Sequence, residues 1–390
     1  MEKIDPYKHK ERYLEWKKNL PNKIEGISKF NSDLLKQYIL DMETGLNVAS
    51  SSKKGSRSYI RLNVLRGRVF RLMQLFEARF NIDKITDLTE THAHSLFMDM
   101  RNGTIKRTDG HNFTAVRNFV KDFKALWHWW IKVNRKNGIT IQDVTCDLDT
   151  TEEKPKWVYL TEDEVKTVCE NAKYDYKVLI MFLFDSGIRA PTELMNVRVS
   201  DFYNNFKELN IREEISKGKI AGRKIKLLLC SQMLNEYVKK KGLSGEDTLF
   251  KTTPRSVNQY LKRLAKRVLE DKTSPAGEKY SNLTMYDFRH CSCCYWLPRY
   301  KSESALKYRF GWKKSEKIYY YSELLGMKDT ISEEDLLVDL TKTEIEKQLH
   351  RSEKEKEIMQ EKLSNVEKDL QIVMKRLQTL EKVSGNDNLT

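Results

Sequence analysis

Two runs in the second half of the chain, TMYDFRHCSCCYWLPRY (residues 284–300) and FGWKKSEKIYYYSELLG (residues 310–326), indicate its fold and its chemistry. The first contains a Tyr-x-x-Arg-His sequence, and the second contains a Gly-Trp pair followed by three consecutive tyrosines. A tyrosine oxygen can attack phosphorus and hold a covalent intermediate. Because an uncharged phenol needs cations around the phosphate to stabilise the transition state, other segments should bring arginine or lysine to the same site.

Two upstream segments contain such cations. FDSGIRAPTELMNVRVSDF (residues 184–202) carries Arg189 directly after an almost wholly apolar run, residues 177–187, which predicts a buried helix. EISKGKIAGRKIKLL (residues 214–228) carries Lys217 and Lys219 in a basic, glycine-interrupted turn. The apolar runs on either side predict strands around residues 209–211 and 224–229.

The ordered set of Gly-Ile-Arg, a hairpin lysine, Tyr-x-x-Arg-His, Gly-Trp and a tyrosine nine residues on resembles the tyrosine recombinases, the phage integrase and Xer-like family. The resemblance spans Arg189 to Tyr321. It implies a mainly α fold with a small antiparallel sheet in the catalytic domain, and two domains that close as a clamp around duplex DNA. It also implies a site-specific recombinase that cuts and rejoins DNA through a 3′-phosphotyrosyl intermediate, with no metal and no other cofactor.

The resemblance assigns the cations of the site. Arg189 and Arg289 would bind the two non-bridging oxygens of the scissile phosphate, because planar guanidinium groups match that geometry. Lys217 would protonate the departing 5′ oxygen, and Lys219 is the alternative. Glu193 lies four residues after Arg189, whereas the family usually has this acid three residues after the arginine.

The resemblance also assigns the aromatic residues. Tyr286 stands where most relatives carry histidine, and it would donate a hydrogen bond to the phosphate. Trp312 occupies the His-or-Trp position and would border the phosphate with its indole N–H. Tyr321 keeps the usual interval from Trp312 and would be the nucleophile, with Tyr320 as the alternative. For His290, next to Arg289, we expect structural support.

The charge of the chain points to a polyanionic partner. Lys and Arg number 71 against 56 Asp and Glu, which gives a formal net charge of +15 and a pI near 9.3. The commonest polyanionic partner is nucleic acid, and the resemblance implies double-stranded DNA; a basic but inert surface is the alternative. The six cysteines show no zinc-binding spacing, and those at 291–294 are predicted to be buried thiols. The N-terminus, MEKIDPYKHK, is polar and no run of about 18 apolar residues occurs, so we expect neither a secretory signal nor a membrane span. We expect a cytoplasmic, nucleoid-associated location.

The N-terminal region predicts a helical arm at residues 1–30 and a helical domain at residues 31–146, which resembles the DNA-binding core-binding domain of the family. Cations precede and flank the second helix of this domain, where they suit phosphate contacts, although a solvated basic face explains them equally well. These candidate DNA-binding residues are Lys53, Lys54, Arg57, Arg61 and Arg68. Of the tryptophans at 127, 129 and 130, two lie on the apolar stripe of the last helix, and Trp129 remains open as a base-stacking residue.

The acidic stretch at residues 147–157 predicts a linker, and residues 158–330 form the predicted catalytic domain. Thr161 and Glu164 form a capping box that begins its first helix. Farther on, residues 257–268 predict a helix with one apolar face and one basic face. Arg263 and Arg267 on the basic face are candidate DNA-binding residues.

A coiled coil is predicted at residues 341–383, where an apolar seam repeats at alternating intervals of four and three. The seam, which is apolar except at Ser352 and Lys356, consists of Ile345, Leu349, Ser352, Lys356, Met359, Leu363, Val366, Leu370, Val373, Leu377 and Leu380. We expect it to associate protomers or to bind a partner, while a single helix that folds back on the body is the alternative. Synapsis would require a homo-oligomer, with a tetramer expected.

Two other functions fit the same residues. A type IB topoisomerase-like enzyme would nick and close DNA by the same chemistry without joining two duplexes. A non-catalytic DNA-binding protein could keep the fold, and the tyrosine at 286 and the shifted Glu193 are compatible with it.

Overall fold

The computed structural model describes residues 3–49, 52, 54–151, 156–216, 222–270, 272–300 and 302–325. Farther on it describes ten single positions, at 352, 356, 359, 360, 363, 364, 366, 367, 370 and 374. The chain divides into two units, residues 1–321 and 322–390. The helices, strands and site residues described below belong to the first unit as far as Tyr321.

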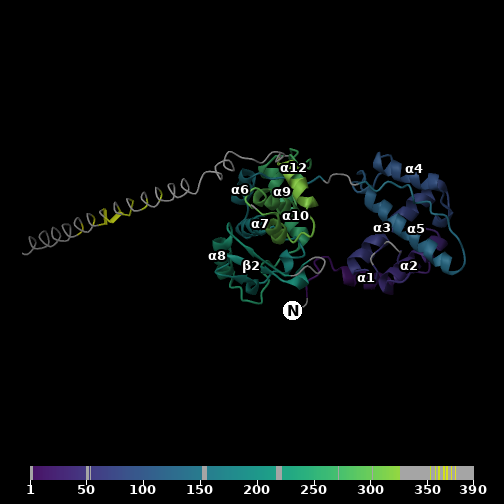
Figure 1. Cartoon of the computed structure of the whole chain (residues 1–390), viewed down its shortest axis with the longest axis horizontal. Helices are drawn as coiled ribbons and strands as arrows, with labels where there is room; N and C mark the ends of the chain where they lie inside the picture. Colours follow the sequence, from purple (N-terminus) through teal and green to yellow (C-terminus); the bar gives the residue numbers. More distant parts are fainter. Residues whose placement is uncertain are drawn as a thin grey trace, which may run out of the picture. The chain divides into compact units, whose positions relative to one another are not determined.

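The N-terminal half forms a helical bundle around one hydrophobic core, seen in purple to blue in Figure 1. Its helices are α1 (His9–Lys18), α2 (Lys29–Thr44), α3 (Tyr59–Phe80), α4 (Glu90–Arg101) and α5 (Val116–Lys136), with a 3₁₀ turn η1 (Ile85–Asp87). The long helix α3 packs against α1, α2, α4 and α5, because its apolar residues recur every three or four positions. Tyr13, in the predicted arm, is part of the same core.

Trp129, the tryptophan that the helical pattern left open, is a core residue. Its side chain is 1% exposed, and its indole Nε1 donates a 2.8 Å hydrogen bond to Oδ2 of Asp41 on α2. Its ring also meets that of Tyr38 edge to face, with centroids 5.2 Å apart. A base cannot stack on a ring buried in this way, so the base-stacking interpretation of Trp129 is wrong.

The following part of the chain is built around α7 (Tyr174–Ser186), which is buried by α10 (Met285–Trp296), α6 (Glu162–Glu170) and α8 (Ser231–Lys241). An apolar surface all around α7 requires burial on every side, as the sequence predicted. The capping box of Thr161 and Glu164 begins α6, as predicted. The remaining helices are α9 (Pro254–Val268), α11 (Glu303–Phe310) and α12 (Glu316–Leu324), with 3₁₀ turns η2 (Leu194–Asn196), η3 (Val199–Asp201), η4 (Glu213–Ile215) and η5 (Tyr280–Asn282).

A small antiparallel sheet completes this part, in the order β1 (Phe202–Tyr203), β2 (Glu208–Ile211) and β3 (Arg223–Lys226). Ile211 pairs with Arg223 and Leu209 with Ile225. The predicted second strand ends early, at Lys226. A carboxylate oxygen of Asp185 at the end of α7 accepts the backbone N–H groups of Leu229 and Cys230, which draws the chain away from the ladder. The predicted fold class, mainly α with a small antiparallel sheet, is confirmed.

The predicted linker is held at both ends. Leu148 belongs to the core of the N-terminal bundle, and Lys124 on α5 donates to the carbonyls of Cys146 and Leu148. Trp157 is buried beside α10 and α12, where it contacts aromatic rings of the candidate site. Among the described residues, no helix is both long and apolar enough to span a membrane.

Candidate active site

Arg189 is placed by the abrupt end of α7. Gly187 ends this helix with φ near +59°, a conformation that residues with a side chain rarely adopt. A Cβ at this position would come within 2.4 Å of the Phe310 ring, so the close approach of α11 also requires glycine. The chain therefore turns sharply at Gly187, and Arg189 follows two residues later.

Glu193 orients Arg189 despite the four-residue spacing. One carboxylate oxygen accepts the backbone N–H of Arg189 at 2.8 Å, and the other accepts its guanidinium Nη1 at 2.9 Å. The guanidinium Nη2 of Arg189 donates to the carbonyls of Gly311, at 2.7 Å, and Phe310, at 3.3 Å. Arg189 is thus fixed between its own turn and the end of α11.

Arg289, on α10, reaches the same place from another segment. Its side chain is 4% exposed and donates to the carbonyls of Gly187 and Phe310. Both acceptors are neutral, so these contacts leave its charge uncompensated. Burial, and next the charge of Arg189, lower the pKa of Arg289 to about 10, which still leaves it protonated near neutral pH. A buried cation of this kind favours an incoming anion.

Arg223 is a third guanidinium of the site, which the sequence reasoning missed. It is buried, donates to Glu193 at 2.9 Å and to the carbonyl of Arg309 at 3.0 Å. Burial raises the pKa of Glu193, but the charges of Arg223 and Arg189 more than offset this, so the net pKa of Glu193 is lowered. Alternation along β3 places Arg223 on the buried face with Ile225, and this period of two was a usable signal.

Gly311 and Trp312 close the site from the end of α11. Gly311 has φ near +60°, and a Cβ there would lie 3.0 Å from Nη1 of Arg223 and 3.4 Å from Nη1 of Arg189. The Trp312 ring stacks on that of Phe310, with centroids 4.9 Å apart, and on that of Tyr321, with centroids 5.9 Å apart and planes 13° from parallel. Trp312 therefore connects the arginine cluster to the tyrosine helix α12.

The three consecutive tyrosines of α12 have different surroundings. Tyr319 is 69% exposed, and Tyr320 accepts a 2.6 Å hydrogen bond from the indole Nε1 of Trp157. Tyr321 is 3% exposed, and its hydroxyl is in hydrogen-bond contact with Nδ1 of His290. Burial raises the pKa of Tyr321 and the positive charge of Arg289 partly opposes this, so Tyr321 is a neutral phenol near Arg289.

Tyr286 and His290 lie one turn apart on α10. Tyr286 is 45% exposed, and its ring meets that of His290 edge to face, with centroids 5.1 Å apart. We expected His290 to give structural support, yet it contacts the hydroxyl of Tyr321 directly. Its spacing of four residues from Tyr286 on one helix was a usable signal, because such residues share a face. The thiols of Cys291, Cys293 and Cys294 are buried, as predicted.

The structure thus gathers Arg189, Arg289, Trp312 and Tyr321 from four segments, with Tyr286 beside His290. Lys217 and its alternative Lys219 lie outside the described residues, as does Lys53. Within the described part of the chain, no group of three or more His, Cys, Asp or Glu side chains could hold a metal ion.

The candidate DNA-binding residues differ in their contacts. Arg61 and Arg68 on α3 both pair with the buried carboxylate of Asp122 on α5, Arg68 at 2.9 Å. These ion pairs join α3 to α5, and Asp122 partly neutralises the charge that Arg61 and Arg68 could offer to a phosphate. Lys54 is exposed and donates to the carbonyl of Ala49, and Arg57 donates to that of Gly55.

On α9 the predicted two-faced pattern is confirmed. Val257, Leu261 and Leu264 are buried, whereas Arg263 and Arg267 are exposed. Arg267 donates to the carbonyl of Asn171, at 3.0 Å.

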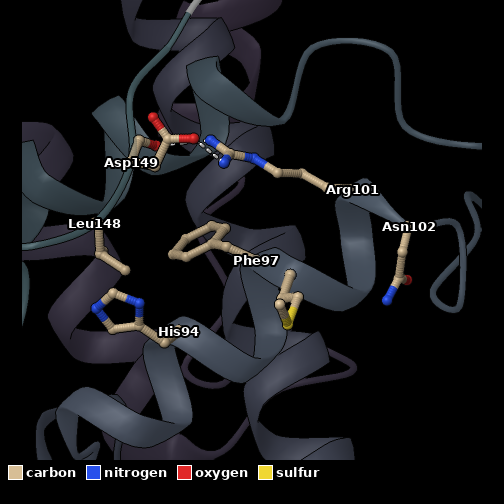
Figure 2. A pocket seen from close by; sticks show the side chains of 7 residues that line it. His94, Phe97, Arg101, Asn102, Leu148 and Asp149 are labelled. Carbon is tan, nitrogen blue, oxygen red and sulfur yellow. Dashed lines mark hydrogen bonds and ion pairs between the residues drawn. The ribbon is translucent and has the colours of Figure 1, made fainter.

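A hollow of about 460 Å³ lies elsewhere, between α4 and the start of the linker. Figure 2 shows Phe97 and Leu148 among the residues that line it, together with the ion pair of Arg101 with Asp149. None of the site residues above lines this hollow.

The chain matches no protein-family model and no curated protein. It does match solved structures. The Tn1549 transposon integrase in complex with transposon right end DNA is 15% identical with a TM-score of 0.52, over 79% of this chain and 98% of that one. A lambda integrase dimer bound to a COC′ core site is 13% identical with a TM-score of 0.56, over 77% of this chain and 79% of that one. The XerH site-specific recombinase bound to a palindromic difH substrate, a post-cleavage complex, is 12% identical with a TM-score of 0.52, over 68% of this chain and 77% of that one. The fold is therefore the one found in tyrosine recombinases.

Proposed function

We propose that this chain is a site-specific DNA recombinase that cuts and rejoins double-stranded DNA through a 3′-phosphotyrosyl intermediate. The observation that carries the proposal is the meeting of Arg189 and Arg289 at the carbonyl of Phe310, with the buried Tyr321 near enough to Arg289 for that positive charge to act on the phenol. Two cations from distant segments can stabilise the negative charge that develops on a phosphodiester when a nearby phenol attacks it. The shared fold of integrases and recombinases supports the same function.

In the proposed reaction, the guanidinium groups of Arg189 and Arg289 bind the non-bridging phosphate oxygens. The hydroxyl oxygen of Tyr321 attacks phosphorus, a P–O bond to Tyr321 forms and the P–O5′ bond breaks. The departing 5′ oxygen takes a proton, which the resemblance assigns to Lys217. A 5′ hydroxyl of a partner strand then reverses the step, and no external energy source is needed because the adduct keeps the phosphoester bond.

The aromatic residues complete the proposed site. Tyr286 is exposed enough to donate its hydroxyl to a bound phosphate, although a phenol is a poor proton shuttle near neutral pH. Trp312 would border the phosphate while its ring holds Tyr321 by stacking. Glu193 would hold Arg189 in place by accepting its guanidinium N–H, and Arg223 would in turn hold the Glu193 carboxylate.

The test is covalent trapping on a pool of nicked duplexes of randomised sequence. The nick lets the short fragment with the new 5′ hydroxyl diffuse away, so that the adduct cannot be rejoined. We expect denaturation-resistant adducts that retain a 5′ label and lose a 3′ label, with Tyr320→Phe still active and Tyr321→Phe inactive. Sequencing the trapped DNA would give the target site.

The outcomes separate the candidate functions. Adducts followed by joining of two duplexes support the recombinase. Relaxation of supercoils without any joining of duplexes would instead favour a topoisomerase-like nicking and closing enzyme. DNA binding with no adduct at any sequence would favour a non-catalytic DNA-binding protein.

We further propose that the C-terminal segment associates copies of this chain as a coiled coil. All ten described positions between 352 and 374 are helical. The described apolar seam residues are 60% to 71% exposed, namely Met359, Leu363, Val366 and Leu370. A second copy would bury the same seam, because a repeat of four and three residues is complementary to itself. Such association would help to assemble the homo-tetramer expected in synapsis.

A further inference from the structure

We propose that His290 is the catalytic residue that accepts the hydroxyl proton of Tyr321 during DNA cleavage. The inference rests on the proposed function and names a residue that the family resemblance leaves without a chemical role. Its basis is the contact between Nδ1 of His290 and the hydroxyl of Tyr321. An imidazole in direct contact with the attacking oxygen is placed for proton transfer.

The nucleophile needs a nearby acceptor. Tyr321 is 3% exposed, so bulk water has little access to its hydroxyl. Burial raises the pKa of this phenol further above neutrality, so spontaneous ionisation is disfavoured. A neutral phenol becomes an effective nucleophile when an adjacent base removes its proton as the new bond forms.

The other titratable neighbours of Tyr321 are poor acceptors. Arg289 is protonated near neutral pH, and Tyr286 is another phenol. Burial raises the pKa of the Cys293 thiol well above its usual value and that of Cys294 to about 12, so both are neutral. A neutral imidazole accepts protons near neutral pH, which leaves His290 as the suitable group among these neighbours.

The imidazole of His290 is held in position by two aromatic rings. The Trp157 ring lies against it, with centroids 4.6 Å apart and planes 34° from parallel, and the Tyr286 ring meets it edge to face. Tyr286 occupies the usual histidine position of the family, so the imidazole of this site is offset by one helical turn along α10.

The proton balance of the step is complete. As the Tyr321 oxygen bonds to phosphorus, its proton passes to Nδ1 of His290, which becomes an imidazolium. The P–O5′ bond breaks and the 5′ oxygen is protonated from the opposite side of the phosphate. In rejoining, a 5′ hydroxyl attacks and gives its proton back to the group that protonated the 5′ oxygen, which the resemblance assigns to Lys217. The P–O bond to Tyr321 breaks, and the imidazolium returns its proton to the tyrosine oxygen.

The decisive variant is His290→Asn. The amide oxygen of asparagine can stand near the Nδ1 position and accept the Tyr321 hydrogen bond, but it does not take up the proton. A merely structural role therefore predicts near-normal cleavage for this variant, whereas a proton-accepting role predicts a loss of about 100- to 10,000-fold in the single-turnover cleavage rate. His94→Asn, at an exposed histidine on α4, is the matched control.

The experiment uses the full chain and a nicked duplex selected by wild-type trapping, made with either a normal or a sulfur-bridged 5′ leaving group. A 5′ thiolate leaves without protonation, so this substrate compensates for a missing proton donor but not for a missing acceptor. We expect His290→Asn to bind the duplex with wild-type affinity and to stay slow on both substrates. His290→Gln is assayed as a second variant, and thermal unfolding is measured for both. Wild-type thermal stability together with slow cleavage would show that the variants have lost function and not their fold.

Three results would overturn the inference. Wild-type cleavage by folded His290→Asn, or its recovery on the sulfur-bridged substrate, would remove His290 from this role and leave the recombinase proposal intact. Failure of the wild-type chain itself to form any Tyr321-dependent adduct would instead reject the recombinase proposal, and the role of His290 with it.

Discussion

The indole Nε1 of Trp157 donates a 2.6 Å hydrogen bond to the hydroxyl of Tyr320. Trp157 lies at the end of the predicted linker, and Tyr320 precedes the proposed nucleophile on α12. The same indole ring meets the Tyr321 ring edge to face, with centroids 6.0 Å apart. The side chain of Trp157 thus joins the end of the linker to the helix that carries the proposed nucleophile, and this contact should help to hold Tyr321 in position.

Trp157→Phe removes the donor and keeps an aromatic ring. We expect the cleavage rate to fall by roughly 2- to 12-fold, since a single hydrogen bond contributes about 0.5–1.5 kcal/mol. Single-turnover cleavage measured for Trp157→Phe, Tyr320→Phe and the double variant forms a double-mutant cycle. Additive losses would show that the hydrogen bond does not position the nucleophile.

Arg189 and Arg289 both donate to the carbonyl of Phe310, and replacing either one by lysine should slow cleavage strongly. Arg189→Lys or Arg289→Lys keeps a positive charge but loses the planar pair of donors that matches two phosphate oxygens. We expect a loss of about 100- to 1,000-fold in single-turnover rate, as for other transition-state donors, with DNA affinity little changed.

Arg299→Lys is the control for these variants, because Arg299 is exposed and pairs with Glu162. Near-normal rates for both Arg189→Lys and Arg289→Lys would contradict the proposed phosphate contact.

Glu193→Gln should destabilise the fold near neutral pH. It leaves the buried guanidinium of Arg223 without its carboxylate, which costs about 3–5 kcal/mol in the free energy of unfolding. The pKa of Glu193 is lowered in the folded state, so its charge stabilises the fold above the unfolded pKa of about 4.3. That stabilisation is lost as the pH falls through the folded-state pKa.

Urea unfolding between pH 7 and pH 3 checks this expectation. The difference between wild type and Glu193→Gln should be largest at pH 7 and should shrink in acid, where Glu193 itself becomes protonated. Glu246→Gln is the control, because Glu246 is exposed although it pairs with Arg198. A difference that stays constant with pH would refute the assignment.

Arg263→Ala should weaken DNA binding without weakening the fold. Arg263 is exposed on the basic face of α9, so its removal should reduce the slope of log affinity against log salt concentration by about 0.9 if it contacts one phosphate. Arg68→Ala is the informative comparison, because Arg68 pairs with buried Asp122 and its loss should cost about 1.5–3 kcal/mol of stability. Fluorescence anisotropy over a salt series and urea unfolding measure the two effects.

Truncation after Leu340 should lower the oligomeric state in solution. A single seam substitution, Leu363→Lys, should weaken association by at least about 10-fold, because burying a leucine side chain contributes about 1.5–3 kcal/mol. Ser364→Lys, at the neighbouring position outside the seam, should leave association unchanged. Sedimentation equilibrium of the three variants measures this, and identical association by the full and truncated chains would reject the coiled-coil proposal.

Local sequence patterns were sufficient for most of the architecture. The period of α9 separated Val257 and Leu261 from Arg263, and the apolar run before Gly187 predicted buried α7. The two strands flanking residues 217–221 were predicted as well, although the second ends at Lys226. These features follow from propensity and period within one segment, so the sequence contains them explicitly.

The partners of the polar side chains were decided only by tertiary structure. Sequence alone gave no reason to pair Arg68 with Asp122 or to bury Trp129 against Asp41. Each of these contacts joins two helices whose relative placement depends on the whole core.

The candidate site shows the same division. Residue types and their order were enough to predict Arg189, Arg289 and Tyr321 as residues of the proposed site. The three-dimensional structure was needed to show that Arg189 and Arg223 both donate to the carboxylate of Glu193. It was also needed to show that His290 contacts the hydroxyl of Tyr321. The physical reason is that helix and strand periods depend on neighbours in the chain, whereas a buried polar group takes its partner from segments that meet only once the core has packed.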